Sequence, residues 1–136
     1  NRPAENAATL VDGWLRTGDI GVLDEDGYPA IVDRKKDMLL YKGYNVYPRK
    51  LEELLHEQPG VVGAAVVGRP DAEVGELPVA FVVAPGLDDA GAAELVRAVN
   101  AELVPYHRIR EIELVDEIPV SAAGNVLRRE LRERLK

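Results

Sequence analysis

The chain contains no cysteine among its 136 residues. Disulfide bonds, thiolate catalysis and cysteine-based zinc sites are therefore excluded. Basic residues are also in the minority, with 17 Lys and Arg against 24 Asp and Glu. Because a nucleic-acid site requires a net basic face, this charge balance argues against nucleic acid as a partner.

Long hydrophobic runs are missing as well. The longest apolar segments, VVGAAVV at 61–67 and VAFVVA at 79–84, are far shorter than the roughly 20 residues that a transmembrane helix needs. The first residues lack the apolar stretch of a signal peptide. We therefore expect a soluble cytoplasmic protein without a membrane span.

The first third of the chain is patterned as β-hairpins. Its first nine residues, NRPAENAAT, are polar and unpatterned, which predicts an extended arm or the trailing end of a larger structure. The segment DIGVLDEDGYPAIVDR at 19–34 has two short β-type runs around an Asp-Gly pair, a strong hairpin signal. MLLYKGYNVYP at 38–48 repeats this pattern, with Gly43 at the predicted turn.

The remainder alternates between helical and strand patterns. Leu51, Leu54 and Leu55 follow Pro48 at helical spacing, which predicts a helix that ends before Pro59. Further patterns predict strands at 61–71, 77–85 and 112–116, and helices at 88–104 and from 125 onward. We therefore expect an α+β fold: a small sheet of about three strands with helices packed on its faces, preceded by β-hairpins.

Three polar motifs are candidates for function: GWLRTGD at 13–19, DRKKDMLLYKGYNVYP at 33–48 and PVSAAGNVLRREL at 119–131. Each motif has a structural explanation when it is considered alone: the first is a turn, the second a solvated charged stretch and the third a glycine bend. Functional explanations are also available. The carboxylate of Asp19 could accept hydrogen bonds from a sugar diol, and Arg34 could fork onto phosphate or ribose oxygens.

The order and spacing of these motifs, together with VVGAAVVGRPDAEVGELPVAFVV at 61–83, resemble the adenylate-forming superfamily of acyl-CoA synthetases, luciferases and peptide-synthetase adenylation domains. The resemblance covers essentially the whole chain, and the segment 36–55 looks most like bacterial fatty-acyl-CoA ligases. In that family a large N-terminal domain binds the acid and ATP. A small C-terminal domain swings about a hinge, first for adenylation and then for thioester formation.

The resemblance implies a role for individual residues. Asp19 would bind the ribose hydroxyls of ATP or of the acyl-adenylate, and Arg34 would contact the nucleotide at the domain junction. Lys36 would occupy the hinge position. The turn of Lys42, Gly43 and Tyr44 would line the pantetheine tunnel after the rotation, where glycine permits a close backbone approach.

One position departs from the family at the predicted catalytic centre. The lysine that contacts the acyl carboxylate and the α-phosphate during adenylation maps to Asn125, which is neutral. Preorganised charge aimed at a transition state is commonly worth ~10²–10³ in rate per donor. Alternatively, Asn125 caps the final helix, since Asn is a favoured residue for that purpose.

The family's phosphate loop, acyl pocket and magnesium-binding glutamate lie upstream of the GWLRTGD equivalent and are not in these 136 residues. The resemblance therefore implies that residues 1–33 are the tail of the large domain and residues 34–136 the mobile domain. It implies ATP, Mg²⁺ and CoA for the parent enzyme, with none bound tightly to this chain and no metal ligands within it. The implied partners are the N-terminal domain and a carboxylic (fatty) acid.

Three functions remain open on the sequence. The first is the C-terminal fragment of an ATP-dependent fatty-acyl-CoA ligase, expected to be inactive alone. The second is the end of a peptide-synthetase adenylation domain. The third is a degenerate, non-catalytic binding module, for which Asn125 is the main argument.

Overall fold

The computed structural model describes residues 2–136. The chain forms two compact units, which comprise residues 1–36 and 37–136, with Asn1 outside the described part. The division between compact units falls after residue 36, whereas the domain boundary expected after residue 33 remains a prediction. Within the described residues, no helix is both long and apolar enough to cross a membrane.

The first unit contains one helix and two small hairpins. Its elements are α1 (Pro3–Thr9), β1 (Leu10–Val11), β2 (Trp14–Leu15), β3 (Asp19–Leu23) and β4 (Pro29–Arg34). The extended arm predicted for residues 1–9 is wrong, because most of this segment forms α1. Pro3 lies in its first turn, where the missing N–H of proline has no intrahelical partner to lose.

The hairpin of β3 and β4 is confirmed, with its strands antiparallel. Its turn is held by Asp24, whose carboxylate accepts the main-chain N–H groups of Asp26 and Tyr28 at 3.0 and 2.8 Å. Gly27 has a φ of +85°, a conformation that suits a residue without Cβ. The Asp-Gly signal in the sequence therefore has the expected physical basis.

The second unit is an α+β domain, as predicted. Its elements are β5 (Leu39–Tyr41), β6 (Tyr44–Val46), α2 (Pro48–His56), β7 (Gly63–Asp71), β8 (Gly75–Val83), α3 (Asp89–Ala101), the 3₁₀ turn η1 (Pro105–His107), β9 (Glu111–Leu114) and α4 (Arg128–Arg134). The strand order is β6-β5-β8-β7, and β9 pairs in parallel with β8.

The sheet has five strands rather than about three. The difference arises because the hairpin of β5 and β6 joins the sheet, with Tyr41 opposite Gly75 at the start of β8. β7 and β8 pair along their whole length, from Gly63 opposite Val83 to Asp71 opposite Gly75. Their buried residues are small or β-branched with one Phe, as expected of strands covered on both faces.

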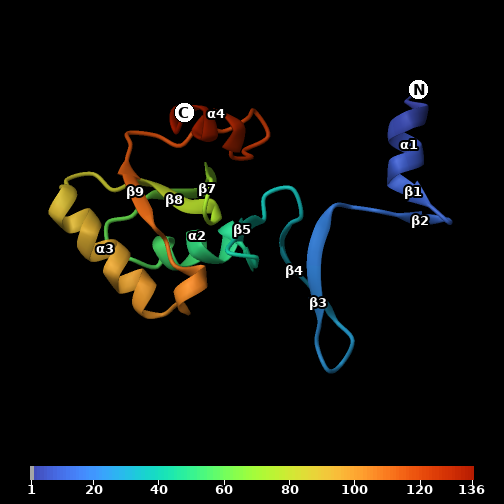
Figure 1. Ribbon diagram of the computed structural model, residues 1–136, viewed down its shortest axis with the longest axis horizontal. Helices are drawn as coiled ribbons and strands as arrows, with labels where there is room; N and C mark the ends of the chain where they lie inside the picture. The colour runs from blue at the N-terminus through green and yellow to red at the C-terminus, as the bar shows by residue number, and fades with distance from the viewer. Residues whose placement is uncertain (1) are drawn as a thin grey trace. The chain divides into compact units, whose positions relative to one another are not determined.

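Helices cover both faces of this sheet (Figure 1). On one face, α2 and α3 contribute the buried residues Leu51, Leu55, Leu95 and Val99 to a large apolar cluster. On the other face, Leu131 of α4 packs with Phe81 in a second cluster. The domain is thus a three-layer sandwich.

The last helix begins later than the sequence predicts. α4 starts at Arg128, not at residue 125, because residues 119–127 bond to one another instead of continuing the helix. Val120 and Val126 form an antiparallel bridge, and the N–H of Leu127 donates to the carbonyl of Pro119 at 2.8 Å. We call residues 119–127 the Asn125 loop.

Candidate functional site

Asp19 and Arg34, both predicted to bind nucleotide, lie side by side. They face one another in the register of β3 and β4, and Nε of Arg34 lies 3.1 Å from Oδ1 of Asp19. The Arg34 side chain is 58% exposed and that of Asp19 25% exposed. The pair therefore presents an acceptor and a fork of N–H donors on one surface of the hairpin.

Asp33 differs from its neighbours because it is buried, with 4% of its surface exposed. Its Oδ1 accepts the main-chain N–H of Arg34 at 2.7 Å. This hydrogen bond fixes the backbone at the residue that carries the predicted nucleotide contact. The charged run at 33–37 is thus only partly a solvated stretch.

Lys36 is exposed and is the last residue of the first compact unit. Asp37, which follows it, is the first residue of the second unit and is partly buried. The predicted hinge position therefore coincides with the division between the two units.

The turn between β5 and β6 is a tight one. Lys42 has a φ of +50° and Gly43 a φ of +82°, so both central residues are in the left-handed region. This is the pattern of a type I′ turn, which matches the twist of antiparallel strands. A Cβ built on Gly43 would meet no atom within 4 Å, so the backbone conformation, not crowding within the chain, favours glycine here.

Aromatic rings and cations gather beside this turn. Tyr44 stacks on Tyr106, with ring centroids 4.2 Å apart and planes at 17°. The ring of Tyr41 has the Lys42 ammonium 5.7 Å away and the Arg110 guanidinium 4.7 Å away. Within residues 2–136, neither cation is paired with a carboxylate.

We call the group of Tyr41, Lys42, Tyr44, Tyr106 and Arg110 the aromatic–cation surface. Unpaired cations beside stacked rings suit an anionic ligand with an aromatic ring. Tyr106 and Arg110 are additions to the residues predicted from the sequence. The mixed basic and aromatic run YHRIR at 106–110 is the signal that points to them.

Asn125 is exposed at the tip of its loop. Its carbonyl accepts the N–H of Ser121 at 2.8 Å, and its own N–H donates to Oγ of Ser121 at 3.2 Å. The residue before α4 is Leu127, which makes no side-chain capping bond. The alternative that Asn125 caps the final helix is therefore wrong.

The Asn125 loop and the turn of Lys42 and Gly43 belong to opposite faces of the sheet. Leu39 and Val46, which flank the turn, pack in the cluster beneath α2 and α3. Val126 packs in the cluster beneath α4. Of the predicted site residues in this domain, those of the turn lie together, whereas Asn125 is on the other side.

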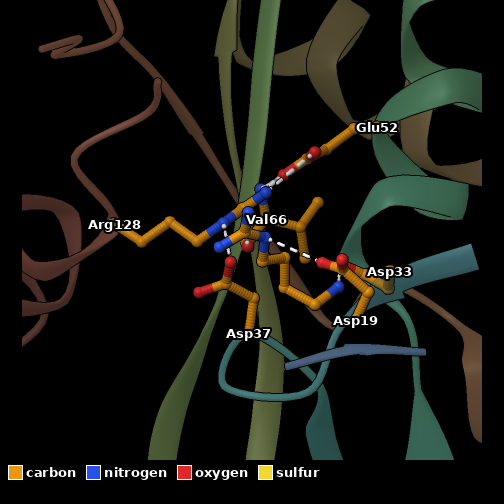
Figure 2. A network of polar contacts seen from close by, with 7 residues as sticks. Asp19, Asp33, Asp37, Glu52, Val66 and Arg128 are labelled. Carbon is orange, nitrogen blue, oxygen red and sulfur yellow. Dashed lines mark hydrogen bonds and ion pairs between the residues drawn. The ribbon is translucent and has the colours of Figure 1, made fainter. Parts of the chain in front are cut away.

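A partly buried polar network connects several elements of the domain. Figure 2 shows Asp37, Glu52 and the main chain of Val66 converging on the guanidinium of Arg128. The two carboxylates and the guanidinium are all between 13% and 17% exposed. The sequence does not predict this network, because nothing in the sequence distinguishes Arg128 from the other arginines of the last helix.

No metal site is evident. The part of the chain that the structure describes has no cluster of three or more His, Asp or Glu residues able to hold a cation. Residues 2–136 therefore offer no site that fits the Mg²⁺ implied for the parent enzyme.

Comparison with known proteins agrees with this fold and with these motifs. Residues 50–125 match the family described as AMP-binding enzyme C-terminal domain. Over 130 residues the chain is 45% identical to the 4-coumarate–CoA ligase-like 6 protein of Oryza sativa subsp. japonica, covering 95% of this chain and 22% of that protein. It is 44% identical over 133 residues to the long-chain-fatty-acid–CoA ligase of Bacillus subtilis (strain 168), covering 98% and 24%.

A solved structure shows the same fold. The o-succinylbenzoate CoA synthetase of Bacillus subtilis, in complex with an acyl-adenylate intermediate, superimposes with a TM-score of 0.89 at 34% identity, covering 97% of this chain and 27% of that one. The chain spans about a quarter of the length of these relatives. It belongs to the AMP-binding enzyme C-terminal domain family, whose relatives here are acyl-CoA ligases and other adenylating enzymes.

Proposed function

We propose that the chain is the mobile C-terminal domain, with the tail of the preceding domain, of an ATP-dependent fatty-acyl-CoA ligase. In the first half-reaction the carboxylate of the acid attacks the α-phosphate of ATP, giving acyl-adenylate and releasing pyrophosphate. In the second, the thiol of CoA attacks the acyl carbon, giving the thioester and releasing AMP. The isolated chain catalyses neither, because the acid and ATP sites belong to the large domain.

The observation that carries this proposal is the placement of two candidate surfaces on opposite faces of one sheet. An enzyme that uses a single active site for two half-reactions can present first one face and then the other by rotating this domain. The aromatic–cation surface serves the thioester step, and the Asn125 loop serves adenylation. Lys36, between the compact units, is the hinge.

Residues on both sides of the hinge have defined roles. The carboxylate of Asp19 accepts hydrogen bonds from the ribose hydroxyls, and Arg34 adds N–H donors from the facing strand. Lys42 and Arg110 attract the phosphates of CoA, and Tyr44 offers a ring for stacking. The type I′ turn at Gly43 brings main chain close to the pantetheine arm.

Asn125 weakens the first half-reaction. Its amide can donate a hydrogen bond to the acid or to the α-phosphate, but it carries no charge to offset the negative charge of the transition state. The adenylation step of the parent protein is therefore slow, and the thioester step is largely intact.

A fatty acid is the proposed substrate class. It is supported by the segment 36–55 and by the similarity to the Bacillus subtilis long-chain-fatty-acid ligase. The plant 4-coumarate–CoA ligase-like relatives have comparable identity, so an aromatic acid is the competing class.

The experiment supplies the full-length protein containing this chain with ATP, CoA and a panel of acids from acetate to long-chain fatty acids and 4-coumarate. Thioester formation from synthetic acyl-adenylates is measured separately. We expect thioester formation with fatty acyl-adenylates and slower pyrophosphate release from the free acids. Activity restricted to 4-coumarate would contradict the fatty acid, and no reaction with any substrate would favour the binding module.

A further inference from the structure

Arg128 uses its whole guanidinium within the domain. Nη1 and Nη2 donate to Oε1 and Oε2 of Glu52 at 2.5 and 3.1 Å, and Nη1 also donates to the carbonyl of Val66 at 2.8 Å. Nε lies 3.6 Å from Oδ2 of Asp37. One side chain therefore joins α4 to α2, to β7 and to the segment that precedes β5.

The Glu52 arm of this network has a structural task. Oε1 of Glu52 accepts the N–H of Val66 at 2.8 Å, while Arg128 donates to the carbonyl of the same residue. Val66 lies in β7, which ends the strand order of the sheet. The pair thus satisfies both main-chain groups of an edge residue, which blocks strand addition at that point.

The Asp37 arm has no such task. Asp37 joins the network through its ion pair with Arg128, and this ion pair holds no main-chain group of a strand edge. Asp37 follows Lys36 directly, so it marks the point where the chain enters the second unit. The ion pair therefore connects the start of the domain to the first residue of α4.

The Asn125 loop is held by hydrogen bonds between its own residues. The N–H groups of Ser121, Gly124 and Leu127 donate within the loop, to the carbonyls of Asn125, Ser121 and Pro119. Arg128 is the next residue after this loop. Its guanidinium therefore ties the C-terminal end of the loop to Glu52 and Asp37.

We propose that Arg128 is a positioning residue, and that its ion pair with Asp37 holds the Asn125 loop in register with the chain segment that follows the hinge. The loop and that segment then turn as one body. A lysine could not replace Arg128, because the bond to Glu52 and the contact with Asp37 require the planar fork. The part of the proposal that concerns rotation rests on the proposed function, whereas the anchoring of the loop does not.

Hydrogen exchange of the 136-residue chain tests the anchoring. Asp37→Asn removes the charge with little change of shape and leaves the bonds of Glu52 to Val66 in place. We expect the Ser121, Gly124 and Leu127 amides to exchange about three to ten times faster, as expected when one partly buried ion pair is lost. The paired amides of β7 and β8 should not change.

The matched control is Arg129→Gln, since Arg129 is the adjacent arginine, is 91% exposed and pairs along its own helix with Glu133. It should leave the loop amides unchanged. Unaltered loop exchange in Asp37→Asn would overturn the proposal. An equal increase across the loop and both strands would also overturn it, because that result would mean a purely structural role.

A kinetic test separates this inference from the proposed function. In full-length protein carrying Asn125→Lys, Asp37→Asn should lower kcat of adenylation about three- to tenfold without raising KM for ATP, and leave thioester formation unchanged. Equal loss in both half-reactions would contradict positioning. Absence of both half-reactions before Asp37 is changed would contradict the ligase function alone, and the exchange result would then decide the anchoring.

Discussion

Asp19 and Arg34 form an ion pair across β3 and β4, with 3.1 Å between Oδ1 and Nε. In the full-length protein, Asp19→Asn should raise KM for ATP about tenfold, because a charged acceptor facing the ribose hydroxyls is lost. Stability should change by less than about 0.5 kcal/mol, since both side chains of the pair are accessible to solvent. Initial-rate kinetics and urea unfolding measure the two effects. Asp26→Asn, in the turn of the same hairpin, is the control and should change neither quantity.

Glu52 and Glu53 are adjacent acids of α2 in different environments. Glu52→Ala should reduce the free energy of unfolding by about 3–5 kcal/mol, because it removes the carboxylate that accepts from both the Arg128 guanidinium and the Val66 N–H. Glu53→Ala should cost less than about 1 kcal/mol, since its pair with Arg49 is exposed. Urea unfolding of both variants checks this, and similar losses would show that the network adds no stability.

The aromatic–cation surface should matter to the thioester step alone. Arg110→Met should raise KM for CoA about tenfold, the scale of a charge-assisted contact to phosphate, and leave pyrophosphate release unchanged. Arg97→Met is the control, because Arg97 lies on the exposed side of α3 and pairs with Glu94. An equal effect of the two variants on KM for CoA would mean that net charge, not this surface, attracts CoA.

Asp71 links stability to pH. Its carboxylate accepts the N–H groups of Glu73 and Val74, and these hydrogen bonds lower its pKa below the ordinary value of 3.8. A depressed pKa means that this contribution to stability is complete above pH 3.8 and is lost as pH falls through the lower folded-state pKa. Asp71→Asn should therefore be less stable than the parent chain at neutral pH. The difference should shrink well below pH 3.8, and a pH-independent difference in urea midpoint would contradict the linkage.

Local signals in the sequence predicted much of the fold. The Asp-Gly turn at 26–27, the apolar runs of β7 and β8 and the helical spacing in α3 each arise from neighbouring residues. One error arose from a distant contact, because β5 joins β8 through Tyr41 and Gly75. Another arose from local bonding, because α4 starts late where the Asn125 loop bonds to itself.

The candidate site likewise has one part that local sequence predicted and one part that it did not. Asp19, Arg34 and the turn at Lys42 and Gly43 were marked by motif and by turn chemistry. The Arg128 network was not predictable, because its guanidinium meets carboxylates more than 70 residues away in sequence, as in the Arg128–Glu52 pair. Only the packing of α4 against the sheet brings these groups together.

The proposed function depends most on the neutral Asn125 at the position where the family has lysine, and single-turnover adenylation tests this dependence. The full-length protein and its Asn125→Lys variant are mixed with ATP and a fatty acid, and the rate of acyl-adenylate formation is measured. Lysine should raise this rate about 10²-fold, the scale of one charge-stabilising donor, and leave the conversion of supplied acyl-adenylate to thioester nearly unchanged. Equal adenylation rates for the two proteins would contradict the claim.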